Sequence, residues 1–519
     1  MKMTGTGNHH RKQNESRWHQ AAWWLALGGW LALFVFFEFF YRNHLCHREQ
    51  FSLFLWAAEP LKSYWTVPAP LARLVGDMLT QFFSIDVVGP LIMATTLVLL
   101  GVLTYRLFVR FIGLWALVPA VLAVTVESGR QCGLTYPLSS TLQWVGIATT
   151  LLVVEQCVLR VIARSAESKV SVLKAVCCSV YTVALLSLGV WLFGWGDWEK
   201  RAVVTPELNV EQMLAIDNDW YHGRDARLEK RLDRLEKTPN RFNAYYRNLL
   251  LTTQYRMGDE LMKYYQPFQA GLFLPVNATT SYPLIYMSGE MWFQVGDMTN
   301  AEHSVLLGML FSPRSVGSRP LKRLAEINLI NGDEAAAMKY LRVLDKTLLY
   351  HRWARTRMAG NRPKGMERWM EMKRTLTATT DTVRAPMDIA TSLRHLLTDN
   401  PDNVFARDYL LSYDLLGKDV EAFVSDYDRF HPVRMIPQRV WAEAQLVWLA
   451  AHGSKEDELA ARNIPPDVTQ EFLEYSDIYQ RAMSSGAATF PTQAYLQLQE
   501  KFGKTYWFFY HFAQTGTQK

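Results

Sequence analysis

The chain has 519 residues, of which 49% are apolar and 20% are charged, and its formal net charge is +6. This mild charge, with no dense run of lysine and arginine, argues against a nucleic-acid partner. No phosphate-binding loop, dinucleotide fingerprint, serine elbow or zinc-protease helix occurs, so no cofactor is expected. The composition changes along the chain: residues 1–200 are rich in Leu, Val, Trp and Phe, whereas residues 201–519 carry most of the charge.

Apolar segments dominate the first 200 residues. A membrane-spanning helix needs about 20 apolar residues, because hydrocarbon offers the backbone no hydrogen-bond partners. Five segments are predicted to span, at residues 21–40, 87–109, 111–126, 138–159 and 175–195. The third is short and contains Pro119, but the pattern of basic residues requires it. The first is too long and too aromatic for a cleavable signal, so it is interpreted as a retained anchor behind the tail 1–20.

Basic residues beside these segments predict the orientation, because lysine and arginine concentrate on the cytoplasmic side. They are frequent in the N-terminal tail, at Arg106 and Arg110, and between the fourth and fifth segments. With five spans, the N-terminus is then cytoplasmic. Everything after about residue 196 is predicted to lie in the periplasm of a multi-pass inner-membrane protein.

The predicted outer loop, 41–86, opens with the polar stretch "YRNHLCHREQ". Its simplest interpretation is the polar end of a membrane helix. His44 and His47 share a helical face and are weak candidates for metal ligands, but no second Cys/His pair completes a zinc site, so no metal is assigned. A Cys46–Cys132 disulfide is a further alternative. These two are the only cysteines in the predicted outer segments, and an oxidising compartment permits the bond.

The layout of this loop also resembles that of the glycosyltransferase C superfamily, whose polytopic members move sugars from lipid carriers. Those enzymes keep an acidic residue in the first outer loop, and here Glu49 follows the first span. Residues 68–83 are predicted to form an amphipathic interfacial helix. The resemblance makes Glu49 a tentative catalytic base acting on an acceptor hydroxyl. Members usually have more than five spans, however, and the expected acidic pair is absent.

A glycine turn recurs through the second half of the chain. It occurs in "HGRDA", "MGDEL", "VGDMT", "NGDEA", "LGKDV" and "HGSKE", whose glycines are residues 223, 258, 296, 332, 417 and 453. Glycine ends a helix by adopting the left-handed conformation, and a following aspartate caps the next helix. The repeated pattern is therefore helix, glycine turn, helix.

The clearest unit, 289–313, resembles a tetratricopeptide repeat. Its small, aromatic, turn and proline positions are occupied by Gly289, Trp292, Gly296, Ala301, Gly308 and Pro313. Residues 201–465 are accordingly predicted to form a tetratricopeptide-like α-solenoid, whose concave face would bind a protein partner. The tail, 466–519, closes with "TYWFFYHF" and is predicted to form capping helices, because so many exposed aromatic side chains would promote aggregation.

Two end motifs carry a further resemblance. The first span ends in "FFYRNHLCHREQFSLF" and the chain closes in "GKTYWFFYHF". With the layout between them, they resemble an uncharacterised family of bacterial multi-span membrane proteins that have a helical extracytoplasmic region. The resemblance covers the whole chain, and because that family has no established activity, it transfers no functional residues.

The sequence therefore predicts an all-α protein with a five-helix transmembrane region, 21–200, followed by the solenoid and its cap. The first functional hypothesis is a scaffold, anchored in the lipid bilayer, that presents the repeats to a protein partner in the bacterial envelope. The second is a membrane glycosyltransferase that acts on a lipid-linked glycan through Glu49. The residues alone leave both open, and with them the question of whether the protein is an enzyme.

Overall fold

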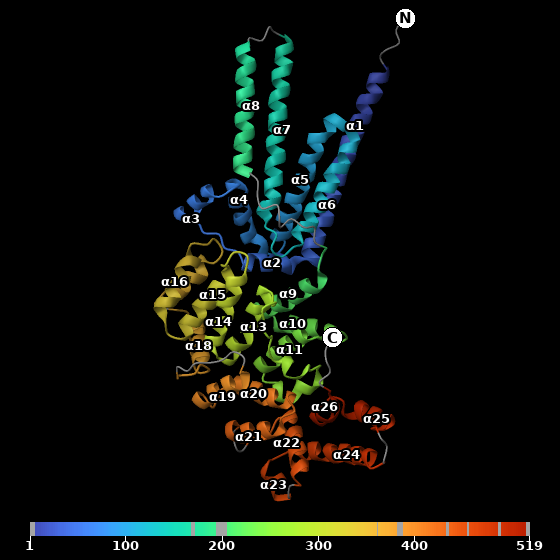
Figure 1. Cartoon of the computed structure of the whole chain (residues 1–519), viewed down its shortest axis with the longest axis vertical. Coiled ribbons are helices and arrows are strands. Elements are labelled where there is room, and N and C mark those ends of the chain that lie inside the picture. Colours follow the sequence, from blue (N-terminus) through green and yellow to red (C-terminus); the bar gives the residue numbers. More distant parts are fainter. Residues whose placement is uncertain are drawn as a thin grey trace. The chain divides into compact units, whose positions relative to one another are not determined.

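The computed structural model describes residues 6–167, 172–193, 205–360, 362–380, 388–431, 435–453, 456–485 and 489–514 (Figure 1). Every regular element in these ranges is a helix, as predicted. The chain divides into two compact units. Unit 1 comprises Met1–Asn218, Pro313–Lys322 and Lys339–Ala359, and unit 2 comprises Asp219–Ser312, Arg323–Met338 and Gly360–Lys519.

This division differs from the predicted domain boundaries. The boundary expected at residues 200 and 201 lies outside the described residues. Unit 1 also takes in two short segments, 313–322 and 339–359, that the sequence assigns to the repeat region. The predicted start of the cap, residue 466, coincides with the start of a helix.

Unit 1 begins with the long helix α1 (Thr6–Val35), a π-helical turn (Phe36–Phe40) and the short helix α2 (Arg42–Gln50). Its other helices are α3 (Ala58–Ser63), α4 (Pro70–Thr80), α5 (Val88–Ile112), α6 (Leu117–Gln131), α7 (Leu138–Glu167), α8 (Val172–Phe193) and α17 (His351–Met358). Three helices contribute residues to both units: α9 (Leu208–Tyr221), α15 (Ser318–Ile330) and α16 (Glu334–Asp345).

Three helical runs among the described residues are long and apolar enough to cross a membrane: Gln20–Phe40, Val88–Gln131 and Leu138–Arg160. The prediction of five separate spans is therefore corrected. The predicted third segment forms α6, whose 15 residues rise only about 22 Å, less than the hydrocarbon thickness of about 30 Å. It belongs to one run with α5, interrupted by a turn at Gly113. The fifth segment is represented by a shorter apolar helix, Ser179–Phe193.

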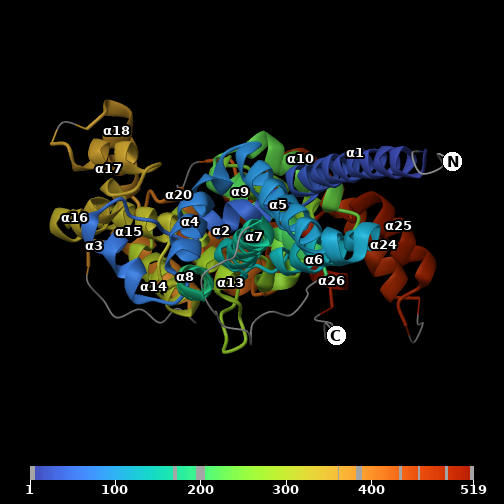
Figure 2. The same ribbon diagram turned by 90° about the horizontal axis from the view of Figure 1, so that it is seen from above.

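Helix α5 is central to the packing of these helices. It packs against α1, α6 and α7, and α7 also packs against α4 and α8. Both views show α5, α6 and α7 side by side (Figures 1 and 2). Helix α4 approaches α7 closely at Gly76, where a Cβ atom would lie 2.7 Å from the backbone of Ser139. The predicted interfacial helix is thus packed against a long apolar helix.

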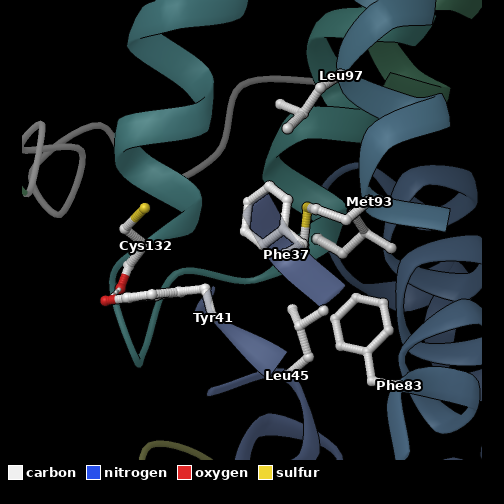
Figure 3. Packing of buried hydrophobic residues seen from close by; sticks show 8 residues of the cluster. Phe37, Tyr41, Leu45, Phe83, Met93, Leu97 and Cys132 are labelled. Carbon is white, nitrogen blue, oxygen red and sulfur yellow. Dashed lines mark hydrogen bonds between the residues drawn. The ribbon is translucent and has the colours of Figure 1, made fainter. Parts of the chain in front are cut away.

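A cluster of buried apolar side chains lies in unit 1 between the end of α1 and the start of α2 (Figure 3). Phe37 comes from the π-helical turn, Tyr41 from the bend that follows it and Leu45 from α2. They meet Phe83, Met93 and Leu97. The hydroxyl of Tyr41 is not left unpaired, because it donates to the carbonyl of Cys132 at 3.1 Å. This contact ties the start of α2 to the end of α6.

Unit 2 consists of shorter helices. They are α10 (Asp225–Leu235), α11 (Arg241–Thr253), α12 (Met257–Glu260), α13 (Tyr282–Val295), α14 (Met298–Phe311), α18 (Lys364–Arg374), α19 (Ile389–Asp399), α20 (Val404–Leu416), α21 (Val420–Phe430), α22 (Arg439–His452), α23 (Glu456–Ala461), α24 (Pro466–Met483), α25 (Thr492–Phe502) and α26 (Tyr506–Phe512). Consecutive pairs such as α13 with α14 and α20 with α21 pack on each other.

The α13–α14 pair shows the predicted turn chemistry. Gly296 ends α13 in the left-handed conformation, with φ of +96°, and the Asp297 side chain accepts from the backbone N–H of Asn300 at 3.0 Å. Small residues allow close approach, since a Cβ atom at Gly289 would lie 2.9 Å from that of Ser304. Positive φ is also found at three other predicted turns, at glycines 223, 332 and 453. At residue 417 the following Lys418 adopts it instead.

Two of these glycines give a matched test of the turns. We expect Gly332→Ala to lower the free energy of unfolding by roughly 1–2 kcal/mol, the penalty of placing an L-residue in the left-handed region. No steric penalty adds to this, because nothing lies within 4 Å of the Cβ position. Gly296→Ala should lower the free energy of unfolding by at least about 1 kcal/mol more than Gly332→Ala does. Its Cβ atom would lie 2.4 Å from the carbonyl oxygen of Leu376. Denaturant unfolding of the purified variants checks the order, and equal losses would contradict it.

Candidate functional site

The polar stretch after the first apolar run is the buried helix α2. Every residue from His44 to Gln50 is buried, and the Glu49 side chain is 2% exposed. The first apolar run does end at Phe40, directly before this stretch, but the stretch itself is buried. The cause is that residues more than 150 positions further along the chain cover α2 with hydrogen-bonding groups.

The N-terminus of α2 is capped by a distant carboxylate. Tyr41 precedes the helix and makes no side-chain cap. Instead, Glu211 of α9 accepts from the backbone N–H groups of Asn43 at 2.7 Å and His44 at 2.8 Å, and from the Asn43 side chain. The first amides of a helix lack partners within the helix, and the helix dipole favours negative charge there. Glu211 thus fixes the start of α2.

Glu49 binds two later segments of unit 1. Its Oε1 accepts from the hydroxyl of Ser318 at 3.2 Å, and both oxygens lie within 2.9 Å of the hydroxyl of Tyr350. The ammonium group of Lys322 lies 5.4 Å from the ring centroid of Tyr350. Glu49, the predicted site residue, therefore lies at the centre of a cluster of hydrogen-bonding side chains.

The environment of Glu49 raises the pKa of its carboxyl group to about 7. Burial is the main cause, because it penalises the charged form. The hydroxyls of Tyr350 and Ser318 and the charge of Lys322 oppose this effect by favouring the carboxylate. The group is consequently poised between its two protonation states near neutral pH.

A buried ion pair lies beside this cluster. The guanidinium of Arg319 donates to both carboxylate oxygens of Asp217, at 2.5 and 2.9 Å, and to Oε1 of Gln50 at 3.1 Å. The side chains of Arg319 and Asp217 are only 1% and 2% exposed. Two parallel bonds of this kind orient both partners, so this pair holds the segment around Arg319 against α2 and α9.

The backbone at Gly317 approaches the end of α2 closely, which brings Ser318 and Arg319 within reach of their partners. A Cβ atom at Gly317 would lie 2.5 Å from the carbonyl oxygen of Gln50, so only glycine fits at this position without a shift. The next backbone N–H, that of Ser318, donates to the carbonyl of Ser52 at 3.3 Å. The backbone N–H of Trp56 donates to the carbonyl of Lys346 at 2.7 Å. Both inserted segments are therefore joined to the chain after α2.

A further polar network extends from α2 to α6 and α7. Arg48 donates to Oε1 of Gln131 at 2.8 Å, and the Gln131 amide donates to the hydroxyl of Thr141 at 2.6 Å. Thr141 and Tyr136 both donate to Oε1 of Glu127, at 2.9 and 2.5 Å. Such buried groups are costly unless they are paired. Here they connect the ends of the apolar helices to α2.

The two histidines of α2 are packed as aromatic rings. His44 stacks on Tyr41 and His47 packs on Phe51, each with ring centroids 4.5 Å apart. Burial lowers the pKa of each to about 3, so both are neutral. In the part of the chain that the structure describes, no group of three or more His, Cys, Asp or Glu residues is placed to hold a metal ion. Among the described residues, none completes a zinc site with His44 and His47, and a metal role for them stays a prediction.

Cys46 and Cys132 are buried free thiols. Their sulfur atoms contact different backbone carbonyls, that of Phe83 for Cys46 and that of Ser128 for Cys132. Burial raises the pKa of both thiols to about 11, which keeps them protonated and unreactive at neutral pH. A disulfide between them stays a prediction for an oxidising compartment.

Sequence reasoning found Glu49 but missed the residues that bind it. Ser318 and Tyr350 are 269 and 301 residues away, and Asp217 and Arg319 are 102 residues apart. Pairs at such separations leave no local spacing pattern. The glycine at position 317, immediately before Ser318 and Arg319, is the one local signal of a close backbone approach.

Comparison with protein families gives one match. A family described as a family of unknown function, DUF6057, matches residues 16–205 and 167–513. The chain belongs to this family. DUF6057 membership confirms the predicted resemblance to an uncharacterised family and assigns no activity to any residue. No curated protein and no solved structure matched the chain.

Proposed function

We propose that this DUF6057 chain is a multi-pass inner-membrane protein of the bacterial envelope. Its tetratricopeptide-like helices form a docking surface for a protein partner outside the cytoplasm. The supporting observation is the network around α2. Through Glu49, Ser318 and Tyr350, and through Asp217 and Arg319, the helix that follows the first apolar run is joined to segments of the helical half. These contacts tie the segments around Ser318 and Tyr350 to the helix that follows the first apolar run.

The repeat character of unit 2 supports the docking role. The α13–α14 pair has a left-handed glycine turn, an aspartate cap and small residues at the crossing. On α14, Leu306, Leu310 and Phe311 expose apolar side chains to solvent. Stacked helix pairs present extended surfaces of this kind to proteins. We therefore assign the partner surface to the exposed residues of α14.

Charge supports the orientation. The N-terminal tail, before the first apolar run, is basic: it contains Lys2, Arg11, Lys12 and Arg17. Clusters of this kind stay on the cytoplasmic side of a membrane. An odd number of crossings would then place the residues from α9 onward outside. Fusion of alkaline phosphatase, active only outside the cytoplasm, to the C-terminus should give active reporter, and an inactive reporter would refute this orientation.

The transferase alternative has less support. A general base must accept a proton from its substrate, but both oxygens of Glu49 are held by hydroxyl groups of the chain itself, and the side chain is buried. A pKa raised to about 7 is the one feature that suits a base. If Glu49→Gln abolished the biological phenotype while folding and partner capture were unchanged, the transferase would be favoured instead.

Site-specific crosslinking in living cells tests the docking surface. A photo-crosslinking residue at Leu310, which is 68% exposed, should trap a defined partner. Leu306→Asp should abolish this product, because an aspartate desolvated at an apolar contact is costly. Leu473→Asp on α24, where the wild-type side chain is 63% exposed against 47% for Leu306, is the control and should leave the product unchanged. An unchanged product in Leu306→Asp would contradict the proposal.

A further inference from the structure

A groove follows one side of α5, between α1 and α6. Both of these helices pack on α5, and the three together line a cavity of about 400 Å³. Helix α1 contributes five of the sixteen lining residues, α5 contributes six and α6 contributes five. The cavity opens to the surface of unit 1, because the lining residues Trp23, Leu25 and Val121 are between 59% and 61% exposed.

The lining of this groove is almost entirely apolar. Twelve of its residues are glycine, alanine, valine or leucine, and among the sixteen that the structure describes Arg106 alone carries a formal charge. Such a lining favours hydrocarbon, because a polar ligand would lose hydrogen bonds to water without finding replacements. From Val98 to Arg106, α5 rises about 12 Å, which is most of the roughly 15 Å that one leaflet contributes to the hydrocarbon of a bilayer. Length and lining therefore both suit one lipid acyl chain.

Arg106 lies near the expected boundary of the hydrocarbon. The first apolar run begins at Gln20, and the ring centroid of Trp23, three residues further on, lies 6.0 Å from the guanidinium carbon of Arg106. Tryptophan concentrates where hydrocarbon meets the headgroups, and a long arginine side chain extends toward water from such a position. The guanidinium is therefore at the level where lipid phosphates lie.

The guanidinium of Arg106 has N–H donors for a phosphate. Arg110, one turn further along α5, is paired with Glu155 at 2.9 Å. Among the described residues, Arg106 contacts the Trp23 ring but forms no hydrogen bond or ion pair. A ring does not supply the oxygen acceptors that the five N–H donors of a guanidinium require. A phosphate supplies them, and it pairs with arginine through two parallel bonds.

A phospholipid supplies both parts that this groove requires. Its acyl chain matches the apolar lining, and its phosphate matches the charge of Arg106 at the level of the headgroups. An anionic headgroup suits Arg106 better than a zwitterionic one, because it has no ammonium group that competes for the phosphate. Basic positions between transmembrane helices bind anionic headgroups in this way.

We propose that this groove binds one anionic phospholipid, with an acyl chain along α5 and the phosphate bound by Arg106. The inference rests on the proposed membrane location of unit 1, but not on its orientation or on the α14 surface. Alkaline carbonate extraction tests the location separately and should leave the chain in the membrane pellet. Release of the chain would refute the location, whereas a retained chain that binds no phospholipid would remove this inference alone.

Native mass spectrometry of the full chain in detergent, with added dioleoyl phosphatidylglycerol, measures the binding. We expect the wild type to saturate with one bound lipid. Gly29→Leu should weaken binding by about tenfold or more, as the loss of burial of two methylene groups does. Its side chain would occupy the groove without a clash, because nothing lies within 4 Å of the Cβ position. Gly28→Leu has equally open surroundings but lies outside the lining, so this matched control should bind as the wild type does.

A second pair of variants tests the phosphate contact. Arg106→Gln should weaken binding of phosphatidylglycerol by about tenfold, because it removes the charge-assisted hydrogen bonds to the phosphate. Arg160→Gln, at the end of the third apolar run and outside the groove, is the control and should have no effect. Undecaprenyl phosphate, which joins a phosphate to a bulkier, methyl-branched chain, should not displace the bound lipid. Equal effects of the two glycine variants or of the two arginine variants would overturn the proposal, as would displacement by undecaprenyl phosphate.

Discussion

Asp217→Asn should lower the free energy of unfolding by about 3–5 kcal/mol. The substitution keeps the shape of the side chain but leaves the guanidinium of Arg319 charged, 1% exposed and without its carboxylate. Desolvation of an unpaired charge is far more costly than the loss of a solvated pair. Gln50 still accepts one bond from Arg319, but an amide oxygen cannot balance a full charge. We expect this to be the largest single-residue effect in unit 1.

The matched control is a pair at the surface of the same unit. Arg355 is 68% exposed and donates to Asp345 at 2.6 Å. Arg355→Gln should therefore cost less than about 1 kcal/mol. The double variant Asp217→Asn with Arg319→Met should recover part of the free energy of unfolding that Asp217→Asn loses, because it also removes the buried guanidinium charge. Unfolding of each purified protein, followed by tryptophan fluorescence, supplies the comparison; similar losses for Asp217→Asn and Arg355→Gln would refute the assignment.

Glu49→Gln should change how stability depends on pH. The folded pKa of Glu49 is about 7, whereas its ordinary value is 4.5. Between these values the folded chain holds more protons than the unfolded chain, so the stability contributed by this group falls as pH rises through the window. The wild type should therefore lose roughly 3 kcal/mol relative to Glu49→Gln between pH 4.5 and pH 7. The two curves should run parallel above that window.

The comparison between variants removes the effect of other groups. His44 and His47 have lowered pKa values of about 3, so their contribution to stability is lost as pH falls below their ordinary value of 6.5. This trend is common to both proteins and cancels in the difference. Tyr350→Phe is a second variant: removal of a hydroxyl that stabilises the carboxylate should extend the window to higher pH. A difference between wild type and Glu49→Gln that does not vary with pH would exclude a titrating Glu49.

Local patterns predicted the helices well. The apolar segments 21–40 and 87–109 appear in α1 with its π-helical turn and in α5, because a continuous apolar run is a local property. The glycine turn at Gly296, with its aspartate cap, was predicted for the same reason. Span number was less accessible, since it depends on whether α6, starting at Leu117, is long enough to cross.

The buried network around α2 could not be predicted from the sequence. The sequence predicted that the polar residues of α2 follow the end of a membrane helix, but no local pattern indicated that they are buried. Whether Glu49 faces solvent or Tyr350 is decided by how segments 313–322 and 339–359 pack, which no local pattern encodes. For the same reason, the domain boundaries inferred from composition differ from the two compact units.

The position of the α2 partners along the chain has a consequence for biosynthesis. A ribosome that has finished α8 has not yet made Glu211, which caps α2, or Asp217, Ser318 and Tyr350. The first amides of α2 must remain hydrated until Glu211 has emerged, and the carboxylate of Glu49 until about residue 350 has emerged. Unit 1 therefore completes the packing around α2 only after about two thirds of the chain has been made.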